Sequence, residues 1–281
     1  MSDSASSQAK RTVLVTGSSG CVGRVVVHGL REAGHTVHGL DRVPHGDIAC
    51  ETLGDIAEAD TWERAFAQAD GNPIDTLVHL AAHPFADGNF LEDLLAPNVI
   101  GLFRALESAA GHGVSRVVLA STLQVASGIT MPSPDDGASP RVSPEAQSPT
   151  NAYAVTKCMA EHFGRIFARK RLCSVIAARI GWFMRRPEHQ TLIEGHPRGQ
   201  EVYVSHRDLS RFFVAAVEAE HAGFGCYWCM SAGTAVDSES LVDGSPYDFE
   251  PGRVALGFEP IDRLPDGSDW PLLEPVSELH A

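Results

Sequence analysis

The segment from Thr12 to Asp41 constrains the fold of this chain more than any other stretch. It begins with a short apolar run, Val13 to Val15, of the kind that forms a buried parallel strand. Three glycines follow at positions 17, 20 and 23, and a helical pattern then runs from about Cys21 to Ala33. Residues 36–40 have the composition of a second strand, with Asp41 at its end. The segment therefore predicts a complete βαβ unit.

The glycine spacing inside this unit is a dinucleotide-binding fingerprint. Gly17 permits a tight turn, Gly20 lets the backbone approach a pyrophosphate, and Gly23 lets the helix pack close to the sheet. Asp41 follows at the distance at which a carboxylate holds the adenosine ribose hydroxyls, and it would repel a 2′-phosphate. The neighbouring Arg42 could accommodate that phosphate, but the acid favours NAD over NADP.

The overall charge and hydropathy exclude several classes of partner. The formal net charge of −14 argues against a nucleic-acid surface or an anionic membrane. No apolar run reaches the length of a membrane span, and residues 1–10 lack the apolar core of a secretory signal. We expect these first residues to form a disordered tail and the protein to be cytoplasmic.

The six cysteines are scattered through the chain, which is typical of free thiols in a reducing compartment. Cys226 and Cys229 form a C-x-x-C pattern that could be a redox or metal half-site. They lie in a strand-like run, where residues three apart point to opposite faces, and no second C-x-x-C completes a zinc site. We interpret them as core residues and expect no metal.

The rest of the chain continues the alternation of strands and helices. Strand patterns occupy residues 47–52, 74–82, 116–120, 173–180 and about 226–230, and helical patterns occupy 61–68, 98–110, 151–171 and a stretch from near Asp208. This order predicts an α/β fold, a Rossmann-type doubly wound parallel sheet with a small C-terminal substrate-binding region. We expect a Rossmann domain over residues 11–181 and a substrate-binding region over 182–281 that is interleaved with the last Rossmann elements.

Two further residues in this pattern have local interpretations that compete with a cofactor role. Asp55 after the third strand could accept a hydrogen bond from the adenine amino group or simply stabilise a helix N-terminus. Asn98 could be the cap of its helix. Residues 127–150 are rich in Pro, Ser, Gly and Asp and predict a long loop insertion, which could serve as a substrate lid.

Three residues suggest hydride-transfer chemistry. A tyrosine phenol titrates near pH 10 in water, so it needs a nearby positive charge to act as a base near neutrality. Lys157 lies one helical turn after Tyr153 and can supply that charge. Thr122 follows the fifth strand, where its hydroxyl can hold a substrate oxygen.

Together these features resemble the extended branch of the short-chain dehydrogenase/reductase superfamily, the NAD-dependent epimerase/dehydratase family. The motifs that match are TGSSGCVG at 16–23, GDI at 54–56, HLAA at 79–82, PNVIG at 97–101, LAST at 119–122, YAVTK at 153–157 and ARIG at 178–181. The resemblance implies that Thr122, Tyr153 and Lys157 are catalytic. It also implies NAD contacts from Gly17, Gly20, Cys21, Val22, Gly23, Asp41, Arg42, Asp55, Ile56, Leu80, Ala81, Ala82, Asn98, Tyr153, Lys157, Ile180 and Gly181.

Within that family the chain is most similar to uronate dehydrogenases, which oxidise the anomeric carbon of a sugar acid. The similarity lies in YAVTKCMAEHFGRIFA, ARIG, VSHRDLSRFF and LGFEP. The chain departs from them at His83-Pro84, Leu123-Gln124 and Trp182. The resemblance implies a sugar-like substrate and a homo-oligomer, a dimer or higher. The residues expected to contact the substrate are His83, Thr122, Gln124, Arg185 and Arg186, where an arginine would pair with a carboxylate.

Two alternatives stay open. A sugar epimerase would use the same three residues with a retained NAD. A non-catalytic NAD-sensing regulator could share the fold, although such proteins often lose the tyrosine or the lysine. A dehydratase is disfavoured, because Leu123-Gln124 lacks the acids that protonate a leaving hydroxyl.

Overall fold

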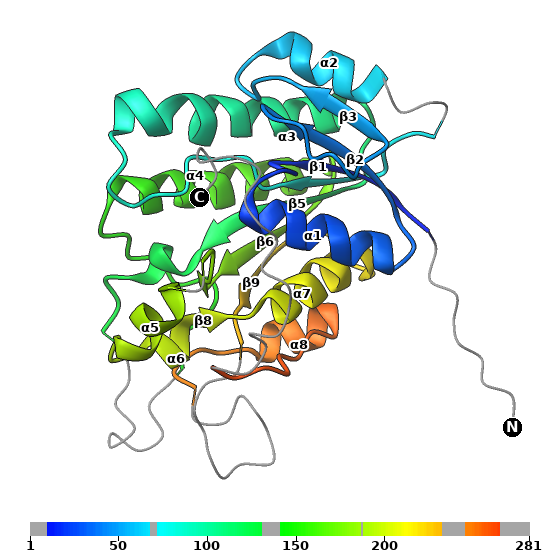
Figure 1. The fold of residues 1–281 in the computed structure, drawn as a ribbon. Helices are drawn as coiled ribbons and strands as arrows, with labels where there is room; N and C mark the ends of the chain where they lie inside the picture. The colour runs from blue at the N-terminus through cyan, green and yellow to red at the C-terminus, as the bar shows by residue number, and fades with distance from the viewer. Residues whose placement is uncertain (1–9, 68–71, 131–140, 187, 232–244, 265–281) are drawn as a thin grey trace, which may run out of the picture.

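A seven-stranded parallel sheet forms the centre of the molecule (Figure 1). This computed structural model describes residues 10–67, 72–130, 141–186, 188–231 and 245–264. The strand order is β3-β2-β1-β4-β5-β6-β9, and every pairing in the sheet is parallel. The strands are β1 (Thr12–Thr16), β2 (Thr36–Asp41), β3 (Cys50–Leu53), β4 (Thr76–His79), β5 (Arg116–Thr122), β6 (Ser174–Ile180) and β9 (Phe224–Cys229). The prediction of a Rossmann-type doubly wound sheet is confirmed.

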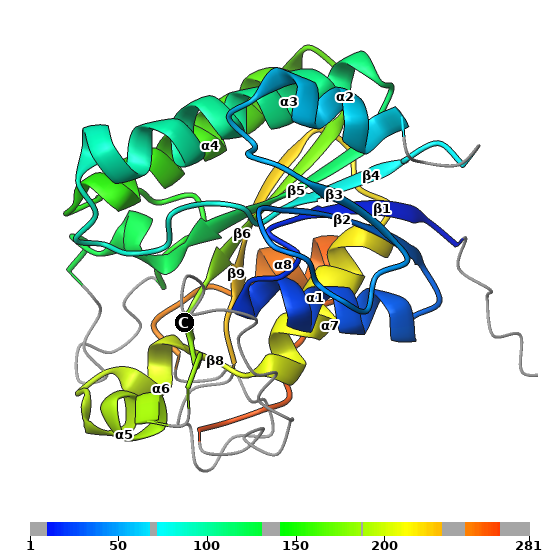
Figure 2. The ribbon, with the colours of Figure 1, turned by 45° about the horizontal axis from the view of Figure 1, so that its top comes forward.

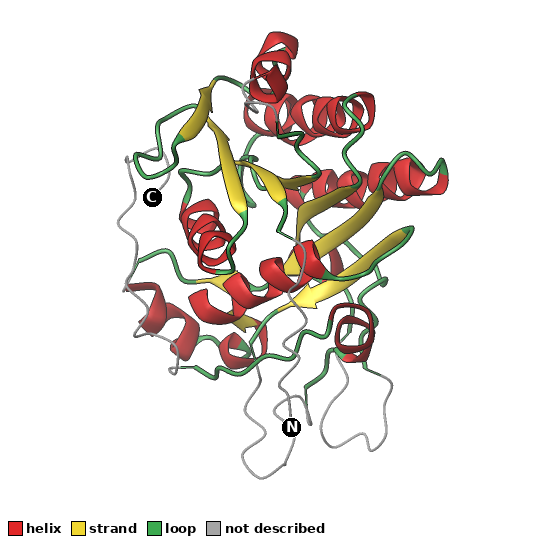
Figure 3. Cartoon of the chain, turned by 90° about the vertical axis from the view of Figure 1, so that its right-hand side faces the viewer, coloured by secondary structure: helices red, strands yellow, loops and turns green. Residues whose placement is uncertain are grey.

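Helices cover both faces of the sheet (Figures 2 and 3). One layer contains α2 (Ala59–Ala67), α3 (Leu102–Gly111) and α4 (Ala152–Arg169), with the helix η1 (Phe90–Gly101) leading into α3. The other contains α1 (Cys21–Glu32), α7 (His206–Glu218) and α8 (Glu250–Leu256). The two faces bury separate apolar cores, one against α1 and α7 and one against α2, α3 and α4. No helix among the described residues is both long and apolar enough to cross a bilayer.

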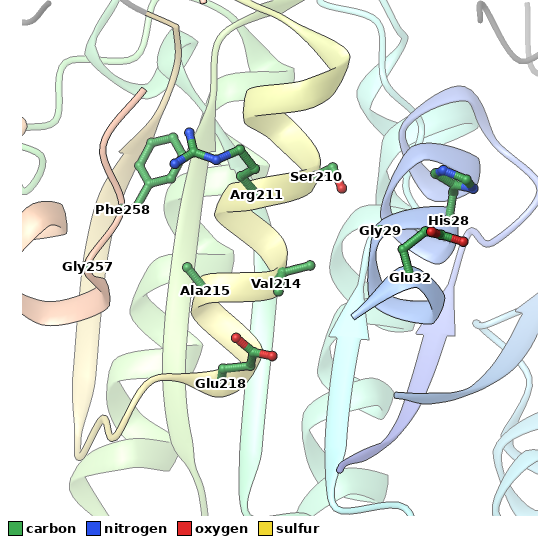
Figure 4. Close-up of a pocket in the computed structure, with 10 residues that line it drawn as sticks. All are labelled: His28, Gly29, Glu32, Ser210, Arg211, Val214, Ala215, Glu218, Gly257 and Phe258. Carbon is green, nitrogen blue, oxygen red and sulfur yellow. The ribbon is translucent and has the colours of Figure 1, made fainter. Parts of the chain in front are cut away.

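The helices α1 and α7 cross in direct contact at Gly29. A Cβ atom at Gly29 would lie only 1.9 Å from the Ser210 hydroxyl oxygen, so a larger residue there would force the Ser210 side chain to move. Beside the crossing, a groove of about 370 Å³ carries His28 and Glu32 on α1 and Arg211 on α7 (Figure 4). This groove shares no lining residue with the crevice at the end of β1 and β4.

A smaller set of elements lies at the carboxyl edge of the sheet. It contains the two-stranded pair β7 (Trp182–Phe183) and β8 (Tyr203–Val204), the helices α5 (Glu188–Gly195) and α6 (Gly199–Val202), and the short 3₁₀ helix η2 (Leu123–Ala126). After β8 the chain goes back to the main sheet, where it forms α7 and the edge strand β9. The expected division of the chain after residue 181 stays a prediction, and most of the expected tail lies outside the described residues.

The helix expected over residues 98–110 begins earlier than the sequence pattern suggested. Asn89 caps η1, because its side chain accepts hydrogen bonds from the backbone N–H groups of Leu91 (2.9 Å) and Glu92 (3.2 Å). The interpretation of Asn98 as a helix cap is therefore wrong, since Asn98 lies inside η1 and is buried. Pro97 obscured the pattern, because a proline usually marks the start or the end of a helix.

A buried ion pair joins the helix α4 to the strand β6. The Glu161 carboxylate on α4 receives two hydrogen bonds from the Arg179 guanidinium on β6, at 2.9 and 2.8 Å, and both side chains are fully enclosed. Ser121 and Gln147 also donate to the carboxylate, each at 2.6 Å. Burial alone would raise the pKa of Glu161, but these hydrogen bonds and the charge of Arg179 bring it below its usual value.

We expect Glu161→Gln to destabilise the protein by about 3–5 kcal/mol, because Arg179 would keep a buried charge without its partner. Chemical unfolding at neutral pH measures this loss. The contribution of Glu161 is present above its unfolded pKa and is lost as pH falls through the lower folded value, so the difference between the two proteins should shrink in acid. Glu145→Gln is the control, since Glu145 is exposed and lies 3.9 Å from Arg165. Equal stabilities of the Glu161 and Glu145 variants would contradict the prediction.

Candidate functional site

A cavity of about 540 Å³ lies at the carboxyl ends of β1, β2 and β4. The chain leaves β1 to form β2 on one side and reaches β4 on the other, so the connections diverge at this point and leave a crevice. The lining residues come from the glycine loop, the ends of β2 and β4, η1 and one distant loop. They include Gly17, Gly20, Cys21, Val22, Gly23, Asp41, Arg42, Asp55, Ile56, Leu80, Ala81, Ala82, His83, Phe85 and Arg185.

The glycine loop has the geometry that a diphosphate requires. Gly17 has φ of +68°, and a Cβ atom there would lie 2.8 Å from the Ala81 backbone nitrogen. At Gly23 a Cβ atom would lie 1.9 Å from the Gly17 carbonyl oxygen. No side chain caps the start of α1, and its first turn contains no acid. The N–H groups of that turn can therefore bind an anion in the crevice.

The Asp41 carboxylate is held in a defined orientation at the crevice wall. It accepts hydrogen bonds from the backbone N–H groups of Ser19 (3.0 Å) and Arg42 (2.6 Å). It therefore links the end of β2 to the glycine loop while lining the cavity. The Arg42 side chain is exposed at the rim. An oriented carboxylate at this place fits the two ribose hydroxyls of NAD.

Asp55 and Ile56 lie after β3 at the crevice. Asp55 accepts a hydrogen bond from the Ala57 N–H group (2.8 Å), which lies before the first residue of α2, Ala59. Both residues line the cavity, so a contact with adenine stays a prediction for them. The backbone of Ile56 is fixed by a hydrogen bond, since its carbonyl accepts from the Trp62 indole N–H at 2.8 Å.

The floor of the crevice depends on Thr16 and His79, which the sequence patterns did not identify. The Thr16 hydroxyl accepts from the backbone N–H groups of Leu80 and Ala81, both at 3.2 Å, and lies 2.9 Å from Nδ1 of His79. The Leu80 N–H group also donates to the Thr16 carbonyl at 3.2 Å. A neutral His79 with its proton on Nε2 can accept the Thr16 hydroxyl proton at Nδ1. Burial lowers the pKa of His79 to about 3, which keeps the ring neutral. The pair therefore fixes the loop after β4.

Asn98 positions the next part of that loop. Its carbonyl oxygen accepts from the His83 N–H group (2.7 Å), and its amide donates to the His83 carbonyl and to the Thr156 hydroxyl, both at 3.1 Å. These bonds join the loop after β4 to α4. Asn98 does not appear among the residues that line the crevice, so its expected NAD contact stays a prediction.

The three candidate catalytic residues come together beside the crevice. Thr122 ends β5, and its hydroxyl is close enough to Tyr153, on the first turn of α4, to lower the pKa of the phenol. Lys157 lies with its ammonium nitrogen 5.6 Å from the centre of the Tyr153 ring and donates to the Ala120 carbonyl at 3.0 Å. All three side chains are buried.

The environment shifts both titrating groups of this set. Burial raises the pKa of Tyr153 to about 12, although the charge of Arg185 and the hydrogen bond with Thr122 oppose the rise. Burial also lowers the pKa of Lys157 to about 8. The phenol is therefore protonated near neutral pH in the free protein.

Of the residues predicted to contact substrate, some line the cavity and others do not. His83 and Arg185 line the cavity, whereas Arg186 is exposed and Gln124 accepts a hydrogen bond from the Asn151 amide at 2.8 Å. Ile180 and Gly181 are not among the residues that line the cavity, so their expected NAD contacts stay predictions. The Gly181 N–H group donates to the Cys229 carbonyl at 3.0 Å.

Comparisons with known proteins agree with this geometry. Residues 13–183, more than half of the chain, match the NAD dependent epimerase/dehydratase family. The NAD-dependent glucose-6-phosphate dehydrogenase of Haloferax volcanii is 25% identical over 89% of this chain and 93% of its own length. The uronate dehydrogenase of Pseudomonas syringae pv. tomato is 25% identical over 89% of this chain and 86% of its own.

The fold comparison gives a similar result. The crystal structure of a mutant uronate dehydrogenase from Agrobacterium tumefaciens, complexed with NAD, superposes with a TM-score of 0.70 and 26% identity. The match covers 90% of this chain and 86% of that one. The chain belongs to the NAD dependent epimerase/dehydratase family, the extended branch of the short-chain dehydrogenases/reductases, and its cofactor is NAD.

Proposed function

We propose that the protein is an NAD-dependent dehydrogenase that oxidises a hydroxyl group of a sugar acid. The observation that carries this proposal is the meeting of Thr122, Tyr153 and Lys157 beside the crevice that fits NAD. A phenol, a hydroxyl and an ammonium group at this place suit the removal of a proton from a carbinol.

Each of the three residues has a distinct role in the proposed reaction. When bound, NAD supplies the acceptor for a hydride. Thr122 holds the substrate oxygen by a hydrogen bond, and Tyr153 in its phenolate form takes the proton of the substrate hydroxyl as the carbon–hydrogen bond breaks. The C–H electron pair leaves with the hydride, so the carbinol becomes a carbonyl. Lys157 stabilises the phenolate by its positive charge.

The proposed substrate class rests on Arg185. Its guanidinium lines the cavity and carries a charge that reaches Tyr153, so it lies near the place where a substrate would react. A guanidinium binds carboxylates and phosphates bidentately, and the similarity to uronate dehydrogenases favours the carboxylate. Arg186 is exposed and outside the cavity wall, so we assign the carboxylate contact to Arg185 alone.

A panel of sugars tests this proposal. Purified protein with NAD should produce NADH from D-glucuronate or D-galacturonate faster than from D-glucose, D-galactose or L-arabinose. Tyr153→Phe should lower kcat by about 10²–10⁴-fold, because the base is lost, while NAD binding stays nearly intact. Absence of NADH with every sugar acid would refute the dehydrogenase, and NAD that co-purifies stoichiometrically would favour an epimerase.

A second prediction concerns the cost of burying Lys157. Its folded pKa of about 8 lies below the unfolded value, so the charged form is destabilised in the fold and stability recovers as pH rises from about 8 to about 10.5. We expect Lys157→Met to be more stable than the wild type at pH 7 by about 1–3 kcal/mol, although inactive.

This difference should shrink as the pH approaches the unfolded pKa of lysine. Thermal unfolding across that range measures it, with Lys170→Met as the control because Lys170 is exposed at the end of α4. A wild type that is the more stable protein at pH 7 would show that the Lys157 ammonium stabilises the fold.

We also propose that the enzyme is a cytoplasmic homodimer that associates through α3 and α4. These helices lie side by side on the outer surface. Phe103, Val155 and Ile166 on them, and Ile100 on the adjoining η1, are between 36% and 45% exposed. Phe103 packs edge-on against Phe163 of α4 at 5.2 Å, so the two helices offer one continuous apolar surface. Exposed apolar surface of this kind is typical of a protein interface, and a second copy offers a matching one.

Phe103→Glu should convert the dimer to a monomer, because each interface would bury two uncompensated carboxylates. Sedimentation equilibrium measures the mass. Val254→Glu is the matched control, since Val254 is 71% exposed on α8, away from this surface. A wild type that sediments as a monomer would remove the proposed dimer.

A further inference from the structure

Phe85 is an apolar residue in an unusual position. It belongs to the loop after β4, lines the crevice and leaves 43% of its side chain exposed. The edge of its ring meets His83 at 5.5 Å and 73°, and His83 is itself held by Asn98. The ring is therefore oriented by its own loop rather than by burial in the core.

Arg185, which follows β7, lies over this ring. The central carbon of its guanidinium is 5.0 Å from the centre of the Phe85 ring. No carboxylate among the described residues forms an ion pair with Arg185. The guanidinium thus faces an aromatic ring in the cavity and forms no ion pair with an acid in the part of the chain that the structure describes.

Both polar groups of the peptide unit between Met184 and Arg185 are hydrogen-bonded. Its N–H group donates to Nδ1 of His189 at 3.3 Å. The carbonyl of the preceding residue, Met184, accepts from Nε2 of His206 at 2.7 Å, and His206 stacks on Phe183 at 4.6 Å. The loop therefore presents one defined side chain to the crevice, and only the direction of the guanidinium depends on Phe85.

We propose that Phe85 is a positioning residue for Arg185 and thereby sets the preference of the enzyme for substrates that carry a carboxylate. Contact with the ring covers one face of the guanidinium but leaves its in-plane N–H groups available. These groups can then form two parallel hydrogen bonds with a carboxylate near Tyr153. Neutral sugars gain nothing from this arrangement. The inference rests on the proposed oxidation of a sugar acid and adds the residue that makes the site selective.

The test compares kcat/KM for D-glucuronate with kcat/KM for D-glucose. Phe85→Leu should reduce this ratio by about 2- to 5-fold, the loss expected for a cation–π contact at a partly exposed site. Phe85→Tyr keeps the aromatic face and should stay within about twofold of the wild type. In an Arg185→Met background, the substitution of Phe85 should have almost no further effect on the ratio, because coupled residues are not additive.

A second measurement does not depend on turnover. The affinity of NAD-loaded Tyr153→Phe protein for D-glucuronate, measured by calorimetry, should fall when Phe85→Leu is added and should stay near its original value when Phe85→Tyr is added instead. Equal losses for the acid and the neutral sugar, or an undiminished effect without Arg185, would overturn the inference and leave Phe85 as a packing residue. Binding that follows these expectations without NADH production would instead refute the proposed dehydrogenation alone.

Discussion

The Glu161 carboxylate is the point on which the reactive end of this molecule depends. It lies one helical turn after Lys157 and two after Tyr153 on α4, and it binds Arg179 of β6 and Ser121 of β5. Ser121 precedes Thr122, so this one buried group holds both elements that carry the candidate catalytic residues. Arg179 also donates to the Ala146 carbonyl, which anchors the chain just before α4.

The Glu161–Arg179 ion pair adds little to stability but fixes the position of α4. A buried ion pair gains little net free energy over apolar packing, because both charges lose their hydration. Its directional hydrogen bonds, however, allow only one placement of α4 against β5 and β6. Lys157 adds to this cost, since burial opposes its charged form. The proposed chemistry needs both features, because a phenol can act as a base only beside a cation held at a defined place.

The cofactor and substrate ends of the crevice are built differently. Around the glycine loop, short side chains and backbone groups form the walls, and close contacts such as Gly17 with Ala81 leave no room for variation. At the substrate end, longer side chains from two separate loops meet, as Phe85 and Arg185 do. Backbone contacts suit a constant ligand such as NAD. Side chains from loops can change one at a time, which lets related proteins accept different substrates.

Local sequence patterns predicted most of the fold, because strand and helix periods, glycine turns and the i, i+4 spacing of Tyr153 and Lys157 depend only on neighbours along the chain. They placed the strands within a few residues and located the crevice. The patterns failed at η1, where Pro97 resembled a boundary and Asn98 resembled a cap.

Contacts between distant segments could be decided only by the tertiary structure. The sequence by itself determined a dinucleotide fold, its acid at Asp41 and a tyrosine one helical turn before a lysine. Tertiary packing decided that Asn98 binds the His83 backbone, that Thr16 hydrogen-bonds to His79, and that Arg185 rather than Arg186 lines the crevice. The physical reason is that a polar side chain takes whichever partner folding brings within about 3 Å, and such partners here lie far away in sequence.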